Sequence, residues 1–151
     1  MQMQPWHLAP WVEVDMVIRL IVAALLSSVV GWERELAAKP AGFRTLGLVG
    51  LGSALFAILS AEAFPGISDP TRIAAGIVTG IGFLGAGTII RTGTAVRGLT
   101  TAASIWSVAA IGVAAAFGFY PIAIAGALLS LLILHLPHKL RPGGNHRHED
   151  R

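Results

Sequence analysis

Residues 80–87, GIGFLGAG, have the spacing closest to a known chemical motif. Their first six residues satisfy G-x-G-x-x-G, which in dinucleotide-binding proteins lets the backbone approach a pyrophosphate. That motif requires a strand before it, an amphipathic helix after it and an acidic residue about 20 positions further on. Asp69 and Pro70 upstream are instead typical of a helix start, and no acidic residue follows Gly85 until Glu149. The context therefore argues against a nucleotide site.

Charged and hydroxyl side chains gather in three groups that border apolar runs. Charges kept inside a bilayer cost about 2.5–3.5 kcal/mol on insertion scales and tend to be functional. Near the ends of a span they can instead anchor the chain at the interface, so both interpretations stay open. The groups are Glu33, Arg34, Glu35, Lys39, Arg44 and Thr45; Asp69 and Arg72 with Glu62, Asp15 and Arg19; and Arg97, Thr100, Thr101 and Ser104.

Two of the charged pairs have the i, i+4 spacing of helical ion pairs. Asp15 and Arg19 form one, and Glu35 and Lys39 form the other if the first helix continues that far. For Asp69, helix capping alone is the simpler interpretation. The spacing therefore predicts local pairing, without deciding function.

No set of residues for catalysis can be assembled from the sequence. It lacks a serine–histidine–acid set, paired catalytic carboxylates and a phosphate loop, so we expect neither an enzyme nor a cofactor. The absence of Cys excludes disulfides and thiolate metal sites. His138, His146 and His148 could bind a transition metal, but a solvated tail without fixed ligand geometry is favoured, and no metal site is predicted.

The elements that position these residues are predicted to be membrane-spanning helices. The chain is 54% hydrophobic and 13% charged with a mean hydropathy of +0.71, whereas soluble domains are usually about a quarter charged. Spanning a bilayer takes about 20 apolar residues. Gly118 and Pro121 break the last apolar region into two helices, because one helix there would be far longer than a bilayer is thick. The five predicted spans are 16–32, 46–64, 71–90, 102–119 and 121–136.

The basic residues predict the orientation of these five spans. Nine of the eleven Lys and Arg residues fall on one side, and only Arg19 and Arg72 fall on the other. Cytoplasmic loops carry an excess of Lys and Arg. The predicted fold is therefore an all-α integral membrane protein with about five transmembrane helices, its N-terminus outside and its C-terminus cytoplasmic.

The chain divides into three predicted segments. Residues 1–13 form an N-terminal interfacial segment, with Trp6 and Trp11 as anchors and no basic region typical of a signal peptide. Residues 14–137 form the transmembrane domain. Residues 138–151 form a polar tail with several histidines, which we expect to be disordered.

The glycines of the third span predict a helix-packing surface. Gly76, Gly80 and Gly87 share one stripe at 100° per residue, beside a second stripe of Ala75, Thr79, Gly82 and Ala86. Small residues let helices approach closely in lipid, so this helix is predicted to be central, with its bulky side outward. Glycines that loosen the helix along an ion path are the alternative. The predicted packing residues are Gly76, Gly80, Gly82, Gly85 and Gly87.

Three extended blocks resemble the membrane domain of the MgtC/SapB family. They are GWERELAAKPAGFRTLGLVGLGSALF, DPTRIAAGIVTGIGFLGAGTII and VRGLTTAASIWSVAAIGVAAAFGFY, in that order, and together they cover about residues 31–120. The resemblance implies about five helices in the bacterial inner membrane. It also implies a role in adaptation to magnesium limitation, acid or host stress, including virulence.

The resemblance carries over particular positions and leaves two departures. The family-like polar residues are those of the three groups above other than Asp15, Arg19 and Glu62. Where many relatives read A-A-Q, this chain has Gly76 after Ala75, which removes a polar side chain from the third helix. The soluble C-terminal domain of longer relatives is expected to be missing, so functions that depend on it do not transfer.

The expected function is that of a non-enzymatic membrane regulator of ion homeostasis. It would act through helix–helix contacts within the lipid bilayer, with a membrane ATPase or transporter, or with a second copy as a homodimer; no nucleic-acid partner is expected. The alternative is a small transporter or channel for Mg²⁺, K⁺ or H⁺, with Asp69 or the group from Glu33 to Arg44 as polar gates.

Overall fold

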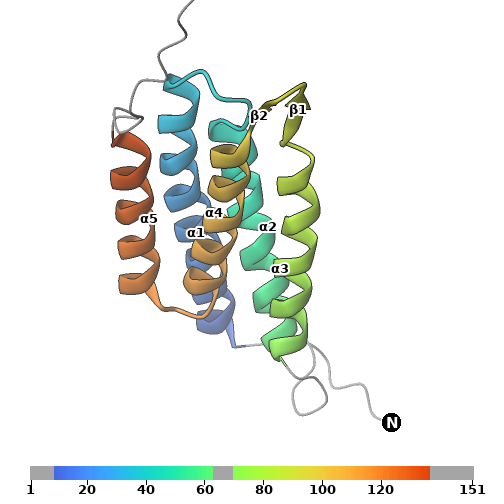
Figure 1. The fold of residues 1–151 in the computed structure, drawn as a ribbon. Helices are drawn as coiled ribbons and strands as arrows, with labels where there is room; N and C mark the ends of the chain where they lie inside the picture. The colour runs from blue at the N-terminus through green and yellow to red at the C-terminus, as the bar shows by residue number, and fades with distance from the viewer. Residues whose placement is uncertain (1–8, 63–69, 137–151) are drawn as a thin grey trace, which may run out of the picture.

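A computed structural model describes residues 9–62 and 70–136, which form a bundle of five helices (Figure 1). The N-terminal residues that include Trp6, the connection that includes Asp69, and the predicted tail at 138–151 lie outside the described residues. The elements in chain order are α1 Pro10–Leu36, α2 Phe43–Glu62, α3 Pro70–Ala86, β1 Ile90–Thr92, β2 Ala95–Arg97, α4 Leu99–Ala116 and α5 Tyr120–His135.

The five predicted helices are confirmed, and three of them are long and apolar enough to cross a membrane. These three are α1, α2 and α4; α3 and α5 are apolar but shorter, with 17 and 16 residues. The predicted break before α5 is also confirmed, because Gly118 adopts a positive φ of 74° and Pro121 lies in the first turn of α5. The side of the membrane on which each end lies stays a prediction.

The third span ends earlier than predicted, and a short hairpin follows it. α3 stops at Ala86, and Ile90 pairs with Arg97 in an antiparallel ladder between β1 and β2. The turn between the strands contains Gly93 at a φ of 60°, the left-handed conformation that tight hairpin turns use. Ile89 and Ile90 extend the apolar run in the sequence, so hydropathy alone assigned them to the helix.

The bundle has two ends with different charge. The α1–α2 connection and the hairpin lie at the same end in Figure 1, which is also where α5 finishes. We call this the polar end, because it carries Arg34, Lys39, Arg44, Arg91 and Arg97. Arg19 and Arg72 belong to the half nearer the opposite end, as the sequence predicts.

The central helix is α4, which contacts all four other helices, and not α3, which contacts α2 and α4. The prediction of a central α3 with its bulky side outward is wrong. Ile77 and Ile81 of α3 are buried with the core, whereas its small residues Ala75, Thr79 and Gly82 are exposed. The glycine count suggested a packed helix, but it could not tell which face of α3 meets its neighbours.

The closest approach of helices involves α1, α2 and α4. A Cβ added to Gly112 of α4 would overlap the carbonyl oxygen of Gly50 and lie 3.1 Å from its Cα. A Cβ added to Gly50 would overlap the hydroxyl of Ser27 on α1, whose Oγ donates a long 3.5 Å hydrogen bond to the Val108 carbonyl of α4. Backbone contact between α2 and α4, with the Ser27 side chain of α1 against both, therefore joins these three helices, as small residues allow in membrane proteins.

The predicted pair of Asp15 and Arg19 is confirmed, at 2.5 Å between Oδ2 and Nη2. Arg19 also donates from Nη1 to the carbonyl oxygen of Ala116, the last residue of α4, at 3.0 Å. A cation at a helix C-terminus satisfies a carbonyl that has no partner within the helix. Arg19 thus ties α1 to the α4–α5 corner.

Gly112→Ala tests the close approach of the three helices. We expect a lower midpoint of thermal unfolding in detergent, by the equivalent of about 1–3 kcal/mol, because the rigid Gly50 backbone cannot make room. Gly52→Ala is the control, since no heavy atom of the described residues lies within 4 Å of its added Cβ. Equal stability of the two variants would contradict the packing described.

Candidate functional site

The polar end brings together ten of the twelve candidate polar residues. They come from the last turn of α1, the α1–α2 connection, the first turn of α2, β2 and the first two turns of α4. Arg34, Thr101 and Ser104 are buried, although each is polar. The remaining candidates are Arg72, exposed at the start of α3 near the opposite end, and Asp69, outside the described residues. The predicted second group is therefore not part of this cluster.

Arg34 is the most buried charged side chain of this cluster, with 4% of the residue exposed. Its Nε and Nη2 donate to Oε2 and Oε1 of the adjacent Glu33 at 2.5 and 2.7 Å. Two parallel hydrogen bonds of this kind hold a guanidinium and a carboxylate in a fixed relative orientation. Glu33 keeps 21% of its side chain exposed, so the pair lies at the boundary between protein and surroundings.

Glu35 joins the end of α1 to the start of α2. Its Oε2 accepts a 2.9 Å hydrogen bond from the backbone N–H of Phe43, the first residue of α2, where N–H groups lack helical partners. The predicted ion pair of Glu35 with Lys39 is not formed among the described residues, because α1 ends at Leu36 and a turn follows. The Glu35 carboxylate therefore accepts a hydrogen bond from the start of α2 and does not pair with a side chain beyond the end of α1.

Two residues that the sequence analysis did not single out, Thr88 and Gly98, meet at the base of the hairpin, where Thr88 Oγ1 donates a long 3.5 Å hydrogen bond to the Gly98 carbonyl. Thr88 donates from Oγ1 to the Gly85 carbonyl at 2.8 Å, and its own carbonyl lies where a Cβ of Gly98 would be. Gly98 precedes α4 with a φ of 87°, a conformation that favours glycine. The signals were available: a hydroxyl residue just beyond the end of a glycine-rich helix, and a glycine just before the next one.

The glycines of α3 divide into two sets. Gly85 packs against Ala102 of α4, with its added Cβ 3.6 Å from the Ala102 Cβ. Gly76, Gly80 and Gly82 have no described neighbour within 4 Å of an added Cβ, and Gly87 meets only carbonyls of its own α3 at this distance. Of the five glycines predicted to pack against other helices, Gly85 is thus the one that does so among the described residues of this chain. Contacts of the others with another chain stay a prediction.

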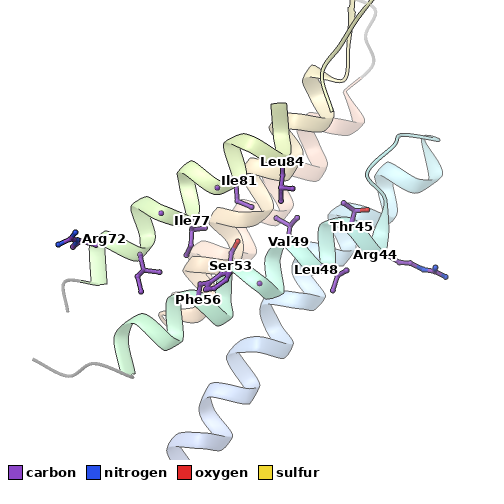
Figure 2. A pocket seen from close by; sticks show the side chains of 14 residues that line it. Arg44, Thr45, Leu48, Val49, Ser53, Phe56, Arg72, Ile77, Ile81 and Leu84 are labelled. Carbon is purple, nitrogen blue, oxygen red and sulfur yellow. The ribbon is translucent and has the colours of Figure 1, made fainter. Parts of the chain in front are cut away.

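An apolar groove of about 920 Å³ runs between α2 and α3 (Figure 2). Its walls carry Leu48, Val49 and Phe56 from α2, and Ile73, Ile77, Ile81 and Leu84 from α3, as Figure 2 shows for most of them. Gly52, Gly76 and Gly80 widen it, because none of them fills the space with a side chain. Arg44 and Thr45 lie at one end of the groove, and Arg72 lies at the other.

The described residues provide neither a metal-binding cluster nor a phosphate-binding turn. Among them, no group of three or more His, Cys, Asp or Glu is placed to hold a metal ion. The G-x-G-x-x-G glycines lie inside α3, so they form no phosphate-binding turn between a strand and a helix. The two features with distinct chemistry are the polar end and the groove.

The Glu33–Arg34 pair can be tested with single and double substitutions. Glu33→Gln is expected to destabilise the protein by about 1–3 kcal/mol, because it leaves the buried Arg34 charge without its carboxylate. Glu33→Gln combined with Arg34→Met is expected to regain much of this loss, measured by thermal unfolding in detergent. A double variant that loses the sum of both single effects would show that the two side chains act independently.

Comparison with known proteins places the chain in a family. A model of the MgtC family matches residues 20–142. The chain is 45% identical over 133 residues to "Putative magnesium transporter YhiD" of Escherichia coli, an alignment that covers 83% of this chain and 62% of that protein. It is 45% identical over 115 residues to "Protein MgtC" of Salmonella typhimurium, covering 76% of this chain and 49% of that protein.

A more distant relative covers nearly the whole chain. "Protein SapB" of Bacillus subtilis is 37% identical over 155 aligned positions, which cover 97% of this chain and 65% of that protein. The chain thus spans about half to two thirds of the length of these relatives. No solved structure matches it significantly. The family match over most of the chain and its apolar helices together show that it is a membrane protein of the MgtC family.

Proposed function

We propose that this chain is a multi-pass protein of the bacterial inner membrane that regulates ion homeostasis, and adaptation to magnesium limitation, through contacts with another membrane protein. The magnesium link rests on the relatives, one of which is named a putative magnesium transporter. The proposed mode of action rests on one observation, the outward position of the small-residue stripe of α3.

That stripe, Ala75, Thr79, Gly82 and Ala86, is exposed along its length. The Thr79 hydroxyl is already used, since its Oγ1 donates to the Ala75 carbonyl at 3.0 Å. In lipid, a bare stripe of small residues gains van der Waals contact when a second helix packs against it. A partner helix from a membrane ATPase, a transporter or a second copy would supply that contact.

The alternative is a small ion transporter, as the name of the Escherichia coli relative suggests. An ion path through the membrane usually carries polar or acidic side chains at mid-depth. Within the four helices α2, α3, α4 and α5 themselves, the single acidic residue is Glu62, the last residue of α2. The scarcity of acidic residues within these helices favours regulation by contact over ion transport. Because no set of catalytic residues can be assembled from the sequence, we also propose that the role is non-enzymatic.

Gly82→Leu tests the contact surface. We expect the variant to lose roughly tenfold of its bound membrane partner, equivalent to about 1.4 kcal/mol, because the new side chain covers the stripe. The measurement is quantitative co-purification from native membranes of cells grown in low Mg²⁺. Gly80→Leu is the matched control, because Gly80 belongs to the same helix but faces the groove. Equal partner recovery from both variants would refute the stripe as the contact surface.

Ion flux in reconstituted vesicles tests the transporter alternative. We expect vesicles that hold the purified chain to take up Mg²⁺, K⁺ and H⁺ no faster than empty vesicles. Uptake that exceeds this background and is abolished by Asp69→Asn would establish transport and overturn the regulator.

A further inference from the structure

We propose that the groove between α2 and α3 binds an acyl chain of an anionic phospholipid, whose phosphate is held by Arg44. This site is separate from the small-residue stripe, because Gly76 and Gly80 line the groove whereas Gly82 does not. The ligand would be a lipid of the surrounding membrane that associates with this chain specifically.

The length of the groove fits one leaflet. Its lining residues run from Arg44 to Phe56 on α2 and from Arg72 to Leu84 on α3, a separation of twelve residues along the helix in each case. At about 1.5 Å per residue, each wall is about 18 Å long. Half of a hydrocarbon core about 30 Å thick is about 15 Å, so an acyl chain whose headgroup is at Arg44 would occupy most of the groove.

The cross-section of the groove fits a flexible chain. Glycines on both walls, Gly52 on α2 and Gly76 and Gly80 on α3, leave space where side chains would otherwise meet. The floor is closed by Ile77 and Ile81, which are buried. A methylene chain offers only dispersion contacts, and these apolar walls offer the same in return.

The charges at the ends select a phosphate. Among the described residues Arg44 forms no ion pair, and Thr45 also lines the same end of the groove. The described lining residues include no Asp or Glu, so the ammonium group of a zwitterionic lipid would find no carboxylate among them. At the other end, Arg72 is the one charged side chain among the described lining residues. Anionic lipid at the Arg44 end is therefore favoured over zwitterionic lipid.

A second helix is the competing occupant. Ser53 is 97% buried, its hydroxyl lies on the groove (Figure 2), and it forms no hydrogen bond with a described residue. A helix with a polar group at this depth would bond to that hydroxyl, whereas an acyl chain has no acceptor for it. A helix that fills the groove would also need acidic groups at both ends, to neutralise Arg44 and Arg72. A lipid headgroup at one end needs only its phosphate to pair with Arg44. The response of Ser53→Ala separates the two occupants.

Native mass spectrometry of the purified chain in detergent tests the proposal, with phosphatidylglycerol and phosphatidylcholine titrated separately. Gly80→Leu should abolish the retention of phosphatidylglycerol by filling the groove, whereas Gly82→Leu, the same change on the outer face of α3, should retain it. Arg44→Ala should weaken phosphatidylglycerol about fivefold, the effect of one basic residue near an anionic lipid. Arg72→Ala and Ser53→Ala should bind it as the unaltered chain does.

Each contrary outcome overturns the proposal. Equal retention by Gly80→Leu and Gly82→Leu would exclude the groove, and equal binding of the two lipids would exclude selection of an anionic headgroup. A tenfold excess of glycerol 3-phosphate should not compete; competition would indicate a site for free phosphate. Loss of phosphatidylglycerol binding in Ser53→Ala would show that a polar part of the ligand bonds to this hydroxyl, and would exclude an acyl chain at this depth of the groove. Failure of the regulator proposal is distinguishable, because it appears as unchanged partner recovery in Gly82→Leu.

Discussion

The structure depends on the close approach of three helices at Gly50, Gly112 and Ser27. In water, burial of apolar surface would drive these helices together, but lipid tails are as apolar as the side chains they would replace. Backbone contact between α2 and α4, with Ser27 of α1 against both, supplies dispersion contacts that larger residues would prevent. The other elements are arranged around this contact: α5 against α1 and α4, and α3 against α4 and the side of α2.

The same physics explains which parts of the fold the sequence could predict. Apolar runs, Pro121 and Gly118 define five helices and their breaks, and the spacing of Asp15 and Arg19 defines their ion pair, because each of these is a local property. The neighbours of each glycine are not local. Gly50, Gly80 and Gly112 are chemically identical, yet only Gly50 and Gly112 touch another helix backbone. Glu35 likewise binds eight residues ahead, beyond any helical spacing.

The candidate site follows the same division. Membership of the polar end is predictable, since helices that alternate in direction bring alternate connections to one side. The groove is not predictable, because it depends on where α3 lies relative to α2. Two of the glycines that suggested tight packing, Gly76 and Gly80, are among the residues that leave it open. The polar end and the groove share Arg44 and Thr45, so one end of the apolar groove lies at the polar end of the bundle.

The fastening of Thr88 against Gly98 has a mechanical consequence for α3. It fixes the end of α3 nearest the hairpin to the start of α4, where Gly85 also packs on Ala102. A change in the angle between α3 and the bundle would therefore disturb the fewest contacts as a rotation about that end. A 17-residue helix is about 25 Å long, so a small rotation gives its largest displacement at the far end, where Arg72 lies. Motion of α3 would therefore be smallest at the polar end and largest at the residues farthest from it.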